Sequence, residues 1–268
     1  MLNILFIGDI SGKIGREAVK ILLPKIKKRY KADIVIANAD NVAHGKGVSK
    51  KTLEELNAAG VDYFTGGDHA FDRLKGIEEV YAGSLPILRP ANWPPLAPGR
   101  GCAIIEKGKF RVLLISLIGR VFMKKDFDCP FREIDGIFAN ASLRTKKLSA
   151  IIIDMHAETT SEKVAMKYYV DGKASALLGT HTHIQTADEE ITSAGTAYLT
   201  DVGMTGFSGG SLGVEKEDIL KTYLDQIKRS HVIPEKGKAI LSGAVVGIDE
   251  KTGKAKSIKR INEIIQIE

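Results

Sequence analysis

The residues with the clearest chemical potential in this sequence are two neighbouring histidines. His181 and His183 are two positions apart and directly follow the apolar run 176–178. A regular strand would point the two rings to opposite faces of a sheet, but both can turn toward one cavity if the strand ends in a loop here. Neutral imidazole is the commonest side-chain metal ligand. The pair therefore predicts a metal site to which other segments must contribute.

Four further segments have the same design, in which an apolar run that reads as a buried strand ends in polar residues. The candidate ligands in them are Asp9; Asp40 and Asn41; Asp68 and His69; and Asp154 and His156. One such residue alone often only turns the chain or caps a helix. Five strand ends of one sheet system would converge, and mixed oxygen and nitrogen ligands with a bridging carboxylate suit a dinuclear Mn, Fe or Zn site. Two metal ions can together polarise a phosphate ester and generate hydroxide for in-line attack.

Hydrophobic periodicity predicts the elements that must position these residues. In the first half, strands are expected at 2–7, 33–37 and 63–65, and helices at 16–30 and 49–59. Pro24 predicts a kink or a break in the first helix, whereas Ser49 and Gly60 are suitable caps for the second. Strands that alternate with helices and end in polar residues predict a parallel α/β core whose ligand site lies at the carboxyl ends of the strands.

The second half is richer in predicted strands, and we expect it to be mostly antiparallel. The segments are a hairpin of 103–105 and 110–117, strands at 150–153, 176–179 and 197–200, and an antiparallel pair of 239–248 and 257–267. Residues 89–101 are rich in proline and glycine and read as a loop. No repeat or linker divides the chain, so we expect one α/β domain of residues 1–268, with two packed β-sheets flanked by helices.

Composition excludes several classes of protein. With 268 residues, 44% of them hydrophobic, the chain can bury a large core. The net charge is +6, but aromatic residues do not interleave with the lysines, which favours a solvated surface over an RNA-binding stripe. The two cysteines, Cys102 and Cys129, have no disulfide or metal-site spacing. No apolar run suits a signal peptide or a membrane span, so we expect a cytoplasmic protein that does not contact membranes.

The order of the ligand segments resembles that of the calcineurin-like metallophosphoesterases, which runs Asp, Asp or Glu, Gly-Asn-His, His and Gly-x-His-x-His. Within that superfamily the chain is similar to the YmdB-type bacterial cyclic nucleotide phosphodiesterases. The segments that carry the likeness are 6–10, 12–16, 44–47, 89–92, 119–120, 156–158, 160–163, 179–187 and 198–206. The resemblance implies a metallophosphoesterase-type four-layer sandwich of two mixed sheets between helices.

The resemblance also implies roles for individual residues. One metal ion would be held by Asp9, Asp40, Asn41 and His183, and the other by Asp40 as the bridge with Asp68, His156 and His181. His69 would protonate the leaving oxygen, a task that suits imidazole at neutral pH. Ser11 stands where most of the superfamily has a histidine, as in the YmdB type. We expect Fe or Mn, with Zn or Mg as alternatives.

Substrate contacts are less well defined by the sequence. Arg16 lies near the start of the first helix, His44 just past the bridging ligand, and Asn92 in the proline-rich loop. Trp93, next to Asn92, offers a stacking face for a base. His231 has no evident partner and reads as a surface residue.

The predicted function is a dinuclear metal-dependent phosphodiesterase that hydrolyses 2′,3′- or 3′,5′-cyclic nucleotides by metal-activated hydroxide. The residues alone reach only metal-assisted hydrolysis of a phosphoester, and the resemblance supplies the cyclic nucleotide. The alternatives are a phosphomonoesterase, an RNA nuclease, and a regulatory or RNA-associated protein with low turnover. The resemblance also makes a homo-oligomer plausible.

Two ligand positions depart from the YmdB-type pattern, which has Glu where this chain has Asp40 and Asn where it has Asp68. Asp68 adds a third anionic ligand, so we expect tighter metal binding, a preference for Mn²⁺ or Fe³⁺ and a higher pH optimum. Asp68→Asn should weaken metal binding and move the pH–rate profile to lower pH. Metal titration and pH–rate measurements beside the parent test this, and unchanged values in both would contradict it.

Overall fold

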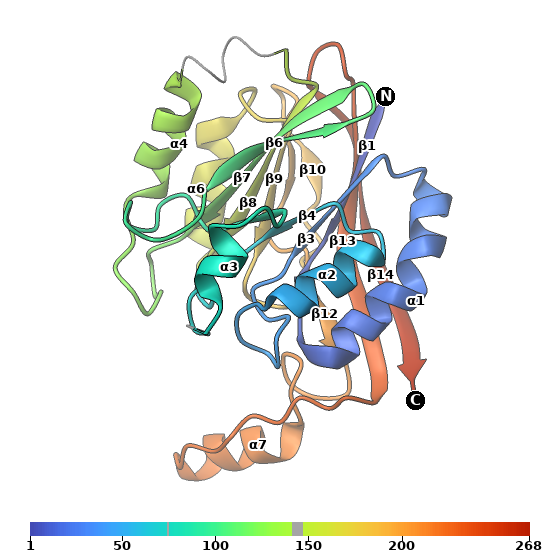
Figure 1. Ribbon diagram of the computed structural model, residues 1–268, viewed down its shortest axis with the longest axis vertical. Coiled ribbons are helices and arrows are strands. Elements are labelled where there is room, and N and C mark those ends of the chain that lie inside the picture. The colour runs from blue at the N-terminus through green and yellow to red at the C-terminus, as the bar shows by residue number, and fades with distance from the viewer. Residues whose placement is uncertain (74, 141–146) are drawn as a thin grey trace.

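The structure is a computed structural model that describes residues 1–73, 75–140 and 147–268. Two β-sheets lie face to face, and helices cover the outer face of each (Figure 1). The helices are α1 (Gly12–Tyr30), α2 (Lys50–Ala58), α3 (Ile77–Tyr81), α4 (Pro130–Ala139), α6 (Thr160–Val170) and α7 (Lys216–Asp225). Among the described helices, none is both long enough and apolar enough to cross a bilayer.

The first sheet has eight described strands in the order β2-β12-β13-β1-β3-β4-β5, with β14 paired to β13. Its strands are β1 (Leu2–Ile7), β2 (Asp9–Ile10), β3 (Ile34–Asn38), β4 (Tyr63–Thr65), β5 (Ile87–Leu88), β12 (Met204–Phe207), β13 (Gly237–Ile248) and β14 (Ala255–Ile267). The predicted parallel core is confirmed, because β1, β3, β4 and β5 pair in parallel.

The second sheet has six described strands in the order β10-β11-β9-β8-β7-β6. Its strands are β6 (Cys102–Lys107), β7 (Phe110–Ile118), β8 (Ala150–His156), β9 (Ala176–Thr180), β10 (Glu190–Ile191) and β11 (Ala197–Leu199). The predicted β6–β7 hairpin and the antiparallel β13–β14 pair are confirmed. The expectation of a mostly antiparallel second half is wrong for β7, β8, β9 and β11, which pair in parallel. The helix α6 crosses over between β8 and β9, as parallel strands require.

Strands of the first sheet contribute to apolar cores on both of their faces. In β1, Leu2, Ile4 and Phe6 pack toward the second sheet, whereas Leu5 and Ile7 pack in the cluster that contains the buried residues of α1 and α2. A third cluster lies between the second sheet and the helices α4 and α6. Burial on both faces explains why the strand sequences are continuous apolar runs rather than alternating ones. The result is four layers, in the order helix, sheet, sheet, helix.

The first helix differs from its predicted form. It begins at Gly12 rather than at Arg16, and it continues through Pro24 as one helix instead of breaking. A proline inside a helix removes a hydrogen bond at a cost of about 3 kcal/mol. Buried apolar residues of α1 on both sides of the proline, including Val19, Leu23 and Ile26, offset that cost. The second helix matches its prediction, because Ser49 caps its start through a capping box with Thr52.

A close approach of two backbones fixes the position of the first ligand segment. Gly8 separates β1 from Asp9, and a Cβ atom at this glycine would lie 1.8 Å from the carbonyl oxygen of Gly203. That distance is far inside van der Waals contact, so only glycine fits here. The crossing therefore places Asp9 beside the segment between β11 and β12.

We predict that Gly8→Ala lowers the free energy of unfolding by at least about 3 kcal/mol, because the methyl group meets backbone that cannot move aside. Gly136→Ala is the matched control, since nothing lies within 4 Å of a Cβ at this position in α4. It should stabilise the protein by about 0.5–1 kcal/mol. Urea unfolding of both variants tests this. Equal stability of the two variants would show that the close approach is wrong.

Candidate metal centre

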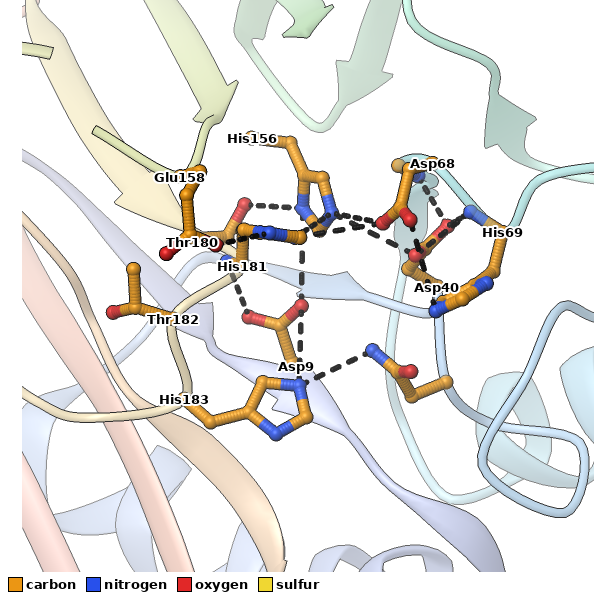
Figure 2. Close-up of polar contacts among 12 residues, drawn as sticks. Asp9, Asp40, Asp68, His69, His156, Glu158, Thr180, His181, Thr182 and His183 are labelled. Atoms are coloured by element: carbon orange, nitrogen blue, oxygen red, sulfur yellow. Dashed lines mark hydrogen bonds and ion pairs between the residues drawn. The ribbon is translucent and has the colours of Figure 1, made fainter. Parts of the chain in front are cut away.

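The predicted ligand segments converge at the place where the carboxyl ends of strands from both sheets meet (Figure 2). Asp9, Asp40 and Asp68 follow β1, β3 and β4 of the first sheet, whereas His156 ends β8 and His181 follows β9 of the second sheet. From the sequence we expected these strand ends to belong to one sheet system, but the site lies between two sheets. Apolar packing between the sheets is therefore what brings the carboxylates and the imidazoles together.

Four of these side chains form a compact group. Nε2 of His156 lies 3.2 Å from Oδ1 of Asp68 and 3.6 Å from Oδ2 of Asp40. Nδ1 of His181 lies 3.1 Å from the same His156 nitrogen and 3.4 Å from Oδ1 of Asp68. His156 and Asp40 are fully buried. This is the set of residues that the resemblance assigns to one metal ion, with Asp40 as the bridge.

A second, more open group adjoins the first through Asp9. Nε2 of His183 lies 4.0 Å from Oδ1 of Asp9 and 3.3 Å from the side-chain amide of Asn41. Asp9 is fully buried, yet its Oδ1 has no hydrogen-bond partner. An unpaired carboxylate oxygen in a protein interior carries a large desolvation penalty. A cation beside this oxygen would remove the penalty, so the residues present fit a bound metal ion.

The hydrogen bonds of His156 determine which of its nitrogens faces the centre. The hydroxyl group of Thr180 donates to Asp154 at 2.7 Å, and its oxygen lies 2.9 Å from Nδ1 of His156. Because the hydroxyl proton is used on Asp154, the Thr180 oxygen accepts from Nδ1–H of His156. This leaves Nε2 of His156 facing Asp68 and Asp40 (Figure 2). Asp154, which the sequence offered as a candidate ligand, instead orients the ring of His156 through Thr180.

The other two histidines are oriented in the same way. Nε2 of His181 lies 2.8 Å from a carboxylate oxygen of Glu158, and Nδ1 of His183 lies 3.1 Å from the carbonyl oxygen of Leu212. Neither partner can donate a hydrogen bond, so these nitrogens carry the protons. The remaining nitrogen of each ring faces the carboxylates. Such second contacts are typical of histidines that bind metals.

The backbone makes this convergence of His181 and His183 possible. The strand β9 ends at Thr180, and both histidines have positive φ angles, of 97° and 66°. These conformations are rare for non-glycine residues, and they turn both rings toward the carboxylates instead of alternating them. The loop that the sequence required at this point is therefore present.

Excess negative charge sets the electrostatics of the centre. Burial alone would lower the pKa of His156, but the hydrogen bond with Asp68 and the charges of Asp40 and Asp9 raise it to about 10. Burial also raises the pKa of Asp40. In Asp68 burial is outweighed by hydrogen bonds from His156 and His181, which hold its pKa below the usual value. The metal-free centre thus attracts protons, and a metal cation would replace them.

His69 lies at the rim of this centre rather than inside it. Its Nδ1 lies 2.6 Å from a carboxylate oxygen of Asp72, and its Nε2 is 3.8 Å from Oδ2 of Asp68. Its backbone N–H donates to Asp40, as does that of Gly67. His69 also lines a cavity of about 360 Å³ in front of the candidate ligands. The loop that presents His69 therefore also holds the Asp40 carboxylate in place.

A buried ion pair that sequence reasoning missed supports the histidine loop. Nζ of Lys163 donates to Asp201 and to the carbonyl oxygen of Thr180, each at 2.8 Å. The same carboxylate accepts from the backbone N–H and the hydroxyl of Thr182. Lys163 and Asp201 are at most 1% exposed. Both residues lie in segments that carry the family likeness, but nothing in the sequence pairs them, because they are 38 positions apart.

Three residues that the sequence suggested as substrate contacts do not line the cavity: Asn92, Arg16 and Trp93. Asn92 is fully buried, and its amide bonds only to backbone groups of Ile118 and Asp128, so the structure contradicts a role in binding substrate. The guanidinium of Arg16 is engaged by Glu55 and the carbonyl oxygen of Val42, and Arg16 does not line the cavity. Trp93 packs between Phe71 and Phe127.

Two further histidines, His44 and His231, lie differently relative to the cavity from what the sequence suggests. His44 is exposed but lies outside the set of residues that line the cavity, so its contact with substrate stays a prediction. His231, which read as a surface residue, lines the cavity together with Tyr223 and Ile219. None of these three residues directly follows a strand, so the strand-end pattern that located the ligands could not have found them.

We predict that Lys163→Met lowers the free energy of unfolding by about 3–5 kcal/mol, since it leaves the Asp201 charge buried and unpaired. Lys167→Met is the matched control, because Lys167 lies on the same helix and pairs with Glu190, which is 48% exposed. The control should cost about 1 kcal/mol or less. Denaturant unfolding measures both, and metal titration of Lys163→Met should show weakened binding. A Lys163 variant as stable as its control would contradict the supporting role.

A family model and a curated relative match nearly the whole chain. A family model described as YmdB-like protein matches residues 5–261. The chain is 44% identical over 260 residues to the 2′,3′-cyclic-nucleotide 2′-phosphodiesterase of Bacillus subtilis (strain 168), and the match covers 97% of this chain and 96% of that relative.

Solved structures with the same fold include two with clear sequence similarity. A protein of Thermus thermophilus without an assigned function superimposes with a TM-score of 0.89 at 38% identity, over 98% of this chain and 99% of that one. A phosphatase of Mycoplasma pneumoniae superimposes with a TM-score of 0.91 at 33% identity, over 99% of this chain and 94% of that one.

Proposed function

The chain belongs to the YmdB-like family, and we propose that it is a metal-dependent phosphodiesterase that hydrolyses 2′,3′-cyclic nucleotides. Family membership confirms the resemblance drawn from the motifs. The predictions of an enzyme and of a metallophosphoesterase-type fold are likewise confirmed. The name of the Bacillus subtilis relative supports the substrate class. The 3′,5′-cyclic nucleotides are a second substrate class within the same proposal.

One observation carries the metal dependence. His156, His181 and His183 each face buried carboxylates with one ring nitrogen, while an acceptor holds the proton on the other nitrogen. The carboxylates repel one another unless protons on these nitrogens or a metal cation lie between them, and a metal cation would replace the protons. We assign one ion to Asp9, Asp40, Asn41 and His183, and the other to Asp40, Asp68, His156 and His181. Ions held there would supply Lewis acidity toward the phosphate and lower the pKa of water.

The residues of this chain contribute orientation and proton transfer. His69 lines the cavity, and its Nδ1 is held by Asp72, so that Nε2 is the nitrogen available to a leaving oxygen. Burial would raise the pKa of Asp72, but the hydrogen bond from His69 and the charge of Lys125 lower it, so Asp72 stays ionised. The ionised Asp72 accepts from Nδ1–H of His69. His69 is therefore suited to protonate the alkoxide that leaves when the cyclic diester opens.

A phosphomonoesterase is the second candidate, because the matching Mycoplasma pneumoniae structure is described as a phosphatase. A monoester and a diester present the same phosphoryl group to the metal ions and differ in the second ester arm. Relative rates with p-nitrophenyl phosphate and bis-p-nitrophenyl phosphate separate the two candidates directly. Cytoplasmic location, a homo-oligomer and RNA as a partner stay predictions.

We predict turnover of 2′,3′-cAMP in Mn²⁺ that is abolished by chelation and restored by adding metal. His69→Ala should lower kcat about 10²–10⁴-fold, which is the usual contribution of a general acid. Its bound metal should stay the same as in the parent, since His69 is not an assigned ligand. Metal analysis and steady-state kinetics on both proteins test this. A metal-loaded parent without turnover would contradict the proposed function, and full activity of His69→Ala would contradict the role of His69.

A further inference from the structure

The cavity in front of the candidate metal centre has two unlike sides. The polar side is formed by Asn41, Asp68, His69, Glu158, His181, Thr182 and His183. The other lining residues are mostly apolar or aromatic, and we call them the apolar side: Ser211, Leu212, Val214, Ile219, Tyr223 and His231. Hydrolysis of a phosphodiester needs only the polar side. The apolar side is therefore available to bind another part of the substrate.

One continuous segment makes the whole of the apolar side. We call residues 211–231 the arm. It includes α7, which projects from the body of the protein (Figure 1). None of the residues of α7 is buried, and Tyr223 is 76% exposed. Ile219 and Tyr223 are four positions apart, so they share one face of the helix, and that face borders the cavity.

The root of the arm is attached to the site. The carbonyl oxygen of Leu212 is the partner of Nδ1 of His183, at 3.1 Å. The Glu215 N–H in the arm donates to the carbonyl oxygen of Val232, which directly follows the arm. Ile233 then packs on Gly45. A Cβ atom at Gly45 would lie 2.1 Å from Cδ1 of Ile233. These contacts hold the arm in front of the metal centre.

We propose that the arm is the nucleobase subsite of the enzyme, and that Tyr223 is the ring on which the base of the substrate stacks. This inference rests on the proposed function and adds a residue that determines specificity. Aromatic side chains stack on all four bases, because every base has a π-face. Ile219 extends the apolar surface beside the ring of Tyr223, and His231, the last residue of the arm, also lines the cavity.

The size and chemistry of the cavity agree with this assignment. A volume of about 360 Å³ falls within the range of small-molecule sites. Tyr223 and Ile219 offer a surface for stacking but no pattern of donors and acceptors that would select one base. The enzyme should therefore prefer nucleotides over diesters without a base, with weak discrimination among bases and a modest preference for the larger purines.

The test compares two cyclic diesters, 2′,3′-cAMP and glycerol 1,2-cyclic phosphate, which has no base. Tyr223→Ala should raise KM for 2′,3′-cAMP about tenfold, equal to about 1.4 kcal/mol, and leave kcat within about twofold. KM for glycerol 1,2-cyclic phosphate should not change. Tyr223→Phe keeps the ring and should behave like the parent. Tyr168→Ala is the matched control, because Tyr168 is 70% exposed on α6 and does not line the cavity.

Binding measurements separate this inference from the proposed function. Calorimetry of the Mn²⁺-loaded protein with adenosine 3′-phosphate and with inorganic phosphate needs no turnover. Tyr223→Ala should weaken binding of the nucleotide about tenfold and leave binding of phosphate unchanged. A parent that hydrolyses neither diester would contradict the proposed function alone. Unchanged nucleotide binding, or an equal loss for nucleotide and phosphate, would overturn the subsite. The subsite would also be overturned if Tyr223→Ala changed the oligomeric state on size exclusion and lost affinity equally for the nucleotide and for phosphate. That result would assign the arm as an interface between copies of the chain.

Discussion

Three buried carboxylates, Asp9, Asp40 and Asp68, meet where two sheets converge, and the rest of the structure is organised around that charge. Anions are costly to bury unless they are paired or hydrogen-bonded. Backbone N–H groups of the loop after β4 satisfy Asp40, and His156 lies within 4 Å of an oxygen of each carboxylate. What stays unsatisfied, above all Oδ1 of Asp9, is a place for a cation.

The surrounding layers keep this arrangement rigid. The apolar core between the sheets places the strand ends, and the buried pair of Lys163 and Asp201 ties down the loop that carries His181 and His183. The relay from Asp154 through Thr180 then sets the proton position of His156. Each support acts on a different degree of freedom: backbone position, loop conformation and tautomer. Together they direct one nitrogen of each ring inward before any metal binds, which is the preorganisation that metal-assisted catalysis needs.

Much of the fold could be predicted because its signals are local. The continuous apolar runs of β1, β3 and β4 follow from burial on both faces, and their polar ends, although buried, mark the candidate ligand site at the carboxyl ends of the strands. Strand direction in the second sheet could not be predicted in this way. Whether β7 pairs with β8 in parallel depends on a crossover through α4, and that choice is made by packing between distant segments. Pro24 shows the same limit, since burial of α1 overrides a local helix-breaking preference.

The sequence by itself determined which residues stand at the five strand ends, because ligand chemistry and strand periodicity are both readable from neighbours in the chain. Only the tertiary structure decided where these residues and their supports lie. It placed the histidines and the carboxylates on different sheets, set the positive φ angles of His181 and His183, and brought Lys163 to Asp201. It also removed Asn92 from the cavity and added Tyr223 and His231 to it. The physical reason is that access to a cavity depends on which distant segments pack around it.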